Sequence, residues 1–207
     1  MTVPSSTLAD EPRIPLLAVE QMSEEQRRLH DAVVAGPRGQ MIGPLRAAIH
    51  SPELAGLWSG FGEFLRYRTC LPPRLNELAI IVTGRRWTSQ VEWWVHARAC
   101  VQAGMGQAAV DAIGALRPPA FDAAADLEVY EFARALQQTG RVPAGVYEAV
   151  KRRWGTRGVV ELVALIGYYT MVSMTLNAHQ LPLPEGAAGL PPETGLVTLP
   201  PGRMAGA

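Results

Sequence analysis

Residues 73–104 read PRLNELAIIVTGRRWTSQVEWWVHARACVQAG, and they contain the densest group of chemically active side chains in this chain. Glu77, Ser89, Glu92 and His96 lie there in otherwise apolar sequence. The proline at the start and the glycine at the end are typical of helix boundaries, so the segment predicts two helices joined by a short turn. Ser89, Glu92 and His96 are spaced i, i+3 and i+7 and therefore share one helix face. Glu77 is expected to approach that face from the preceding helix.

Composition limits the classes of protein to which the chain can belong. Its 207 residues fit one domain with tails, and a hydrophobic content of 48% is enough for a sizeable core. The formal net charge is zero, so neither nucleic acid nor a membrane surface is expected as a partner. Cys70 and Cys100 have no metal or redox spacing, which suits a reducing cytoplasm. The N-terminus has no signal-peptide pattern, and the apolar run 162–172 is too short to cross a bilayer.

Helical periodicity is widespread, whereas the alternation typical of strands is scarce. We therefore expect an all-α domain of eight or nine helices over residues 22–180. An extended arm over 1–21 precedes it, and a Pro/Gly-rich tail over 181–207 follows. The tail is expected to add nothing to a core, but it could wrap onto a neighbouring subunit. Caps and prolines place the helices at about 24–35, 44–50, 52–67, 73–87, 90–103, 107–116, 123–138, 143–154 and 157–179.

The pattern Glu77-x11-Ser89-x2-Glu92-x3-His96 resembles the active-site signature of the AhpD-like, carboxymuconolactone decarboxylase superfamily. In the peroxidase branch of that superfamily, two cysteines stand where this chain has Ser89 and Glu92, whereas the glutamate and the histidine match in identity and spacing. A serine and a glutamate cannot perform thiol chemistry, so a disulfide-relay peroxidase is not expected.

Segments further out are similar to the decarboxylase-like branch. They are Gly43-Pro44-Leu45 through His50-Ser51-Pro52, and Leu176-Asn177 through Leu181-Pro182-Leu183-Pro184. The resemblance covers roughly residues 25–185. It implies an AhpD-like helical domain that forms a homo-oligomer, a trimer or hexamer, with a dimer as the alternative. It also implies cofactor-free decarboxylation, or related lyase or isomerase chemistry, on a small carboxylated compound.

The candidate catalytic residues are His96, Glu77 and Glu92. Loss of CO₂ leaves negative charge on a substrate, and His96 could supply the proton because its ordinary pKa lies near neutrality. Glu92 beside it would favour the charged imidazole. Arg85 and Arg86 are predicted to bind substrate carboxylates by paired hydrogen bonds. Ser89 and Trp93 complete the predicted substrate-binding set, and no metal or cofactor is expected.

Other interpretations of the same residues stay open. The protein could be a peroxide-related oxidoreductase that uses Cys100 or a bound cofactor, or a non-catalytic ligand-binding or scaffold protein. Glu92 and His96 could form only a helix-surface pair, Arg85 and Arg86 could only balance a helix end, and Glu77 could be a structural carboxylate tied to an arginine. A metal site is a further alternative, with Glu92 and His96 as two ligands and Glu77, His50 or His179 completing the shell. The side chains of His179, Tyr168, Tyr169 and one of Trp93 and Trp94 could also reach the site.

Overall fold

The structure, a computed structural model, describes residues 11–37, 39–191 and 195–206. Within these residues the chain forms eight α-helices, one short 3₁₀ helix and two strands of two residues each, so the prediction of an all-α fold with eight or nine helices is confirmed. The helices are α1 (Glu24–Ala35), α2 (Leu45–Ala48), α3 (Pro52–Tyr67), α4 (Pro73–Arg86), α5 (Gln90–Gln102), α6 (Gln107–Gly114), α7 (Ala124–Thr139) and α8 (Ala144–Ala178). The 3₁₀ helix is η1 (Val19–Gln21), and the strands are β1 (Ala120–Phe121) and β2 (Arg203–Met204).

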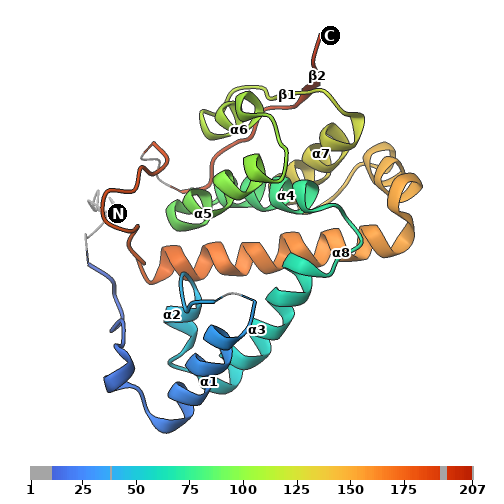
Figure 1. Cartoon of the computed structure of the whole chain (residues 1–207). Helices are drawn as coiled ribbons and strands as arrows, with labels where there is room; N and C mark the ends of the chain where they lie inside the picture. The colour runs from blue at the N-terminus through green and yellow to red at the C-terminus, as the bar shows by residue number, and fades with distance from the viewer. Residues whose placement is uncertain (1–10, 38, 192–194, 207) are drawn as a thin grey trace, which may run out of the picture.

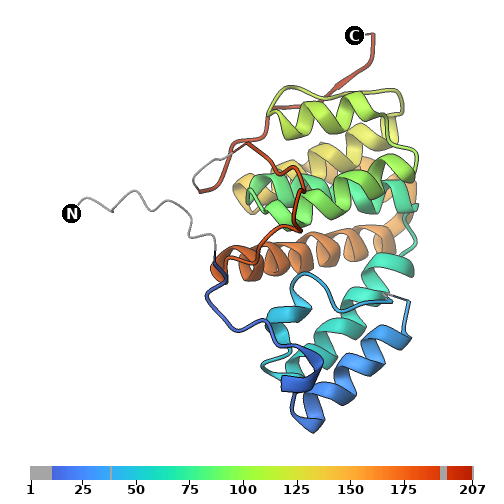
Figure 2. The ribbon, with the colours of Figure 1, turned by 60° about the vertical axis from the view of Figure 1, so that its left-hand side comes forward.

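Helix α8 crosses the middle of the molecule and separates two groups of helices (Figure 1). Helices α1, α2 and α3 lie on one side of it, and α4, α5, α6 and α7 lie on the other (Figures 1 and 2). Helix α4 packs against α5, α7 and α8 and is therefore the centre of the second group. The site described below lies where α4, α5 and α8 meet.

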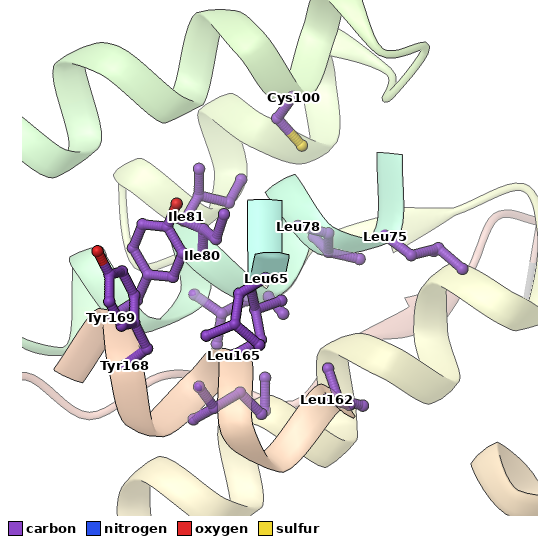
Figure 3. Close-up of a cluster of buried hydrophobic side chains, with 14 of the residues drawn as sticks. Leu65, Leu75, Leu78, Ile80, Ile81, Cys100, Leu162, Leu165, Tyr168 and Tyr169 are labelled. Carbon is purple, nitrogen blue, oxygen red and sulfur yellow. The ribbon is translucent and has the colours of Figure 1, made fainter. Parts of the chain in front are cut away.

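Helix α4 is buried on all sides, and every residue from 75 to 85 is buried. A helix that is apolar around its whole circumference has to be surrounded by other elements. Figure 3 shows Leu75 and Leu78 of α4 in one cluster with Leu162 and Leu165 of α8. The polar residues of α4 between positions 75 and 85, including Glu77, are thereby placed inside the protein.

At three helix boundaries the structure adds local detail to the helices expected from the sequence. Ser89 is the N-cap of α5, but its side chain makes no capping hydrogen bond. Ala123, and not Asp122, is the N-cap of α7. The predicted helices 143–154 and 157–179 are the two segments of α8, and they meet at a kink where Gly155 has the non-helical angles φ 68° and ψ −175°. Glycine tolerates this left-handed conformation at little cost.

The length of α8 raises the question of whether this helix could cross a membrane. Over its 35 residues α8 is long and apolar enough to cross a membrane by length and composition alone. More than half of its most apolar window, 56%, is buried inside the protein. The core helix of a folded domain has these properties too, and α8 packs against α3, α4 and α7.

The C-terminal tail packs on its own chain, against the expectation that it adds nothing to a core. Leu190, Val197 and Leu199 are buried, and Arg86 donates a hydrogen bond to the Val197 carbonyl. Strand β2 pairs in parallel with β1, and Figure 2 shows the tail passing alongside the α4 and α5 group. Burial of branched side chains together with main-chain pairing fixes this described part of the tail to the monomer.

The N-terminal arm is also attached to the rest of the chain. The Arg13 backbone N–H donates to the His179 carbonyl at 2.9 Å, and His50 Nε2 lies 2.8 Å from the Pro15 carbonyl. His50 and His179 therefore contact the arm. Residues 1–10 of the arm, like residues 192–194 and 207 of the tail, lie outside the described residues.

Candidate active site

His96 lies between two carboxylates. Its Nδ1 is 2.6 Å from Glu77 Oε2, and its Nε2 is 3.0 Å from Glu92 Oε1. Glu92 comes from the same face of α5 as His96, and Glu77 comes from α4. The two helices pack closely at Gly84, where a Cβ atom would stand 3.5 Å from Glu92 Cβ. The predicted approach of Glu77 to the α5 face is therefore present.

The three side chains are buried. His96 and Glu92 are each 4% exposed and Glu77 is 7% exposed, so Glu92 and His96 do not form a surface pair. Burial by itself would lower the pKa of His96, but the charges of Glu77 and Glu92, and their hydrogen bonds, raise that pKa to about 9. The imidazole is therefore charged at neutral pH and donates a hydrogen bond to each carboxylate.

Two further residues join this cluster from other helices. Arg66, in the last turn of α3, places Nε 3.8 Å from Glu77 Oε1. The ring of Tyr169 on α8 meets the His96 ring edge-on, with 5.1 Å between their centroids, and burial raises the pKa of the Tyr169 phenol well above its ordinary value. The sequence pattern did not indicate Arg66, because it belongs to a different helix and has no fixed spacing to Glu77.

Ser89 is completely buried, and its Oγ has no hydrogen-bond partner among the described residues. Its backbone N–H donates to the Gly84 carbonyl at 2.8 Å, which closes the turn between α4 and α5. A buried hydroxyl without a partner is costly, so it calls for an explanation. Its predicted role in substrate binding stays a prediction.

The two arginines predicted to bind substrate are engaged elsewhere in the fold. Arg85 is 1% exposed and donates from Nε to the Gly114 carbonyl at 2.9 Å, and from Nη1 to Thr88 Oγ1 at 3.1 Å. Arg86 donates to the carbonyls of Gln137 and Val197. These hydrogen bonds join α4 to α6, to α7 and to the tail. None of these four partners belongs to the His96 cluster.

Trp93, also predicted to bind substrate, lies against α6. A Cβ atom on Gly114 would stand 2.7 Å from Trp93 Cζ2, so the ring occupies the space that this glycine leaves. Trp94 is stacked under the guanidinium of Arg98, which is 3.9 Å from the ring centroid. Neither indole is among the described contacts of His96.

Cys100 follows His96 by one helical turn and is completely buried. Burial, together with the charge of Glu77, raises its pKa to about 12, so the thiol is protonated at neutral pH and is a poor nucleophile. Figure 3 places Cys100 on the opposite side of α4 from Leu162 and Leu165. Among the described residues, no three His, Cys, Asp or Glu side chains are arranged as ligands of a metal ion.

The two cavities described for this fold lie away from the cluster. One, of about 160 Å³, lies under the N-terminal arm and is lined by residues that include Met22, His30 and Ile49. The other, of about 310 Å³, is lined by Glu128, Ala149, Arg152 and Arg153.

The fold is that of known proteins, although the sequence matches no protein-family model and no curated protein. An uncharacterized peroxidase-related protein from Silicibacter sp. TM1040 superposes with a TM-score of 0.66 at 13% identity, over 88% of this chain and 96% of that one. An AhpD-core, uncharacterized peroxidase-related protein from Ralstonia eutropha JMP134 superposes with a TM-score of 0.67 at 11% identity, over 84% of this chain and 93% of that one. The debrominase Bmp8, solved in complex with 2,3,4-tribromopyrrole, superposes with a TM-score of 0.59 at 13% identity, over 76% of this chain and 82% of that one.

These similarities define the class of the molecule by its architecture. Because they extend over most of each chain, the protein has the AhpD-like all-α fold. Identities of 11–13% establish the fold and leave the reaction to be inferred from the side chains.

Proposed function

We propose that this protein is a thiol-free, cofactor-free acid–base enzyme that decarboxylates or isomerises a small carboxylated compound. The observation that carries the proposal is the buried imidazole of His96 between Glu77 and Glu92, whose carboxylates lie 2.6 and 3.0 Å from its two nitrogens. A charged histidine that is shielded from water can donate one proton to a reaction in which negative charge develops on the substrate.

The reaction proceeds as follows. The bond between the substrate carbon and its carboxylate breaks, CO₂ leaves, and the electron pair is delocalised as an enolate. The enolate carbon then takes a proton, and the solvent later returns a proton to the site. In an isomerisation, the carboxylate of Glu77 takes a proton from one substrate carbon and returns it to another, so no net proton is gained or lost.

Glu77 is the group that passes the proton from His96 to the substrate. Both ring nitrogens of His96 are hydrogen-bonded to carboxylates, so the proton leaves through one of them. Glu77 lies between His96 and the more exposed Arg66, whereas Glu92 is 5% exposed at its side chain. Glu92 keeps the imidazole charged and correctly oriented.

The proposal is tested by a thermal-shift screen of carboxylated lactones and other small ring-derived acids, followed by NMR measurement of turnover for each compound that binds. We expect His96→Gln to lower the rate by about 10²-fold or more while the fold is retained. His50→Gln is the matched control, since His50 contacts the arm and not the cluster. Equal turnover in native protein and His96→Gln would refute the proposed role, and binding without turnover would favour a ligand-binding protein.

A further inference from the structure

Arg66 is the most exposed of the four charged side chains in the cluster. Its side chain is 23% exposed, compared with 10% for Glu77 and 5% for both Glu92 and His96. It comes from α3, whereas the other three come from α4 and α5. A molecule that approaches the buried carboxylates from solvent therefore meets Arg66 first.

Within the described part of the chain, the guanidinium of Arg66 has N–H donors that are not used in hydrogen bonds. Arg66 approaches Glu77 at 3.8 Å, too long for a hydrogen bond, and its Cζ lies 5.4 Å from the centroid of the Tyr67 ring. Tyr169 and Glu92 also interact with it electrostatically. An arginine carries several N–H donors in a planar fork. Arg85 and Arg86, by contrast, direct hydrogen bonds at carbonyl and hydroxyl oxygens of the fold.

The formal charges of the four side chains cancel, so an anion at this position is held by the geometry of Arg66 and not by a net positive charge. Glu77 and Glu92 carry two negative charges, and the imidazolium of His96 balances one of them. The other is balanced by Arg66, but only across the long contact to Glu77. A planar carboxylate fits the guanidinium fork with two parallel hydrogen bonds, which are stronger than this single long contact.

From these contacts we infer that Arg66 is the anchor for the substrate's carboxylate, in place of the Arg85 and Arg86 pair indicated by the sequence. The inference rests on the proposed function, because it names the group that holds the substrate at the same site. The ligand is a small organic acid with one carboxylate paired to Arg66 beside Glu77, and in a decarboxylation a second carboxylate is the group that leaves as CO₂. The ring of Tyr67 lies within cation–π distance of the guanidinium, with 5.4 Å between Arg66 Cζ and the ring centroid.

The test uses benzoate as the anionic probe and benzamide as its neutral counterpart of the same shape. The protein is labelled with ¹⁵N-histidine, and since the chain has four histidines, the His96 signals are assigned by their loss in His96→Gln. We expect benzoate, but not benzamide, to shift the His96 signals in a saturable way. Arg66→Met should weaken benzoate binding by about tenfold or more, and Arg66→Lys by less, because it keeps the charge but not the fork.

Arg68→Met is the matched control. Arg68 lies two residues further on, is 59% exposed at its side chain, and contacts Glu63 and the ring of Phe64, so its loss should leave benzoate affinity unchanged. If Arg66→Met does not fold, as judged by its thermal midpoint, Arg66→Lys alone decides the question. Native benzoate affinity in the folded Arg66 variant, or equal binding of benzamide, would overturn the inference.

The two proposals fail in different ways. Benzoate binding that depends on Arg66, without turnover of any carboxylated compound, would refute the proposed function and leave the anchor in place. Turnover with an unchanged KM in Arg66→Lys would refute the anchor and leave the acid–base reaction in place.

Discussion

At the scale of single residues, the pKa of His96 links the candidate site to the stability of the fold. Its pKa is about 9 in the folded protein, above the ordinary value of about 6.5 that it regains on unfolding. A group whose pKa is raised by folding contributes its full stabilisation at pH values below its unfolded-state pKa. That contribution is lost as the pH rises through its folded-state pKa. The window in which stability should fall is therefore about pH 6.5 to 9.

We expect the free energy of unfolding to decrease by roughly 3 kcal/mol across this window. Urea unfolding at pH 6, 7.5 and 9 measures it, and His96→Gln should lack this part of the pH dependence. Parallel pH profiles for the two proteins would contradict the expectation. A ¹⁵N titration of His96 in the native protein gives the pKa directly, and it serves if the variant is too unstable to unfold reversibly.

The cluster could be predicted from the sequence in part, for a geometric reason. Glu92 and His96 are one turn apart on a single helix, and Glu77 is on the next helix of the same hairpin, so local spacing was enough to bring them together. Arg66 could not be found in this way, because the contact depends on how α3 packs beside α4. For the same reason, the sequence could not show that Arg85 and Arg86 make their hydrogen bonds to α6, α7 and the tail.

At the scale of elements, the positions of the helices could be predicted from prolines and apolar periodicity. The capping contacts and backbone angles at the helix ends could not be predicted in this way. The break expected at Gly155 is present, because this residue has the non-helical angles φ 68° and ψ −175°, which glycine tolerates, and the two predicted helices meet there at a kink. Ser89 occupies the N-cap position of α5, but its buried hydroxyl makes no capping hydrogen bond.

Contact between α5 and α6 gives a prediction at this scale. Gly114→Ala would place a Cβ atom 2.7 Å from the Trp93 ring, and a rigid indole cannot yield as a flexible chain would. We expect the free energy of unfolding to fall by about 1–3 kcal/mol, as measured by urea titration. Gly60→Ala is the control, because Gly60 lies in α3 with no atom within 4 Å of such a Cβ, and it should raise stability by up to about 1 kcal/mol. Equal stabilities of the two variants would show that Trp93 moves freely.

At the scale of the whole molecule, the outer face of α8 supports the prediction of a homo-oligomer. Val160, Val163, Met171 and Met174 are 39–63% exposed, with Gly167 at the middle of the same face. No charged residue occurs from 162 to 178. An apolar, uncharged stripe is self-complementary, and a central glycine lets two copies of the helix cross closely, so we expect a second copy of this chain to cover it.

Light scattering coupled to size-exclusion chromatography tests this expectation. We expect the native protein to elute as an oligomer and Met171→Glu to shift to the mass of a monomer, because a buried unpaired charge is costly. Val34→Glu is the control, since Val34 is 39% exposed on α1, outside this stripe. A native monomer at micromolar concentration, or an unchanged mass for Met171→Glu, would contradict the prediction.

The central position of α8 has a consequence for how the protein is made. Helices α4 and α5 leave the ribosome well before α8, which ends at residue 178 of 207. Until α8 is synthesised, the apolar side chains of α4 have no cover on that side, and the buried charges of Glu77 and His96 remain open to water. We therefore expect the group around α4 to bury its apolar face only after α8 has emerged, so that this face is exposed to aggregation for most of translation.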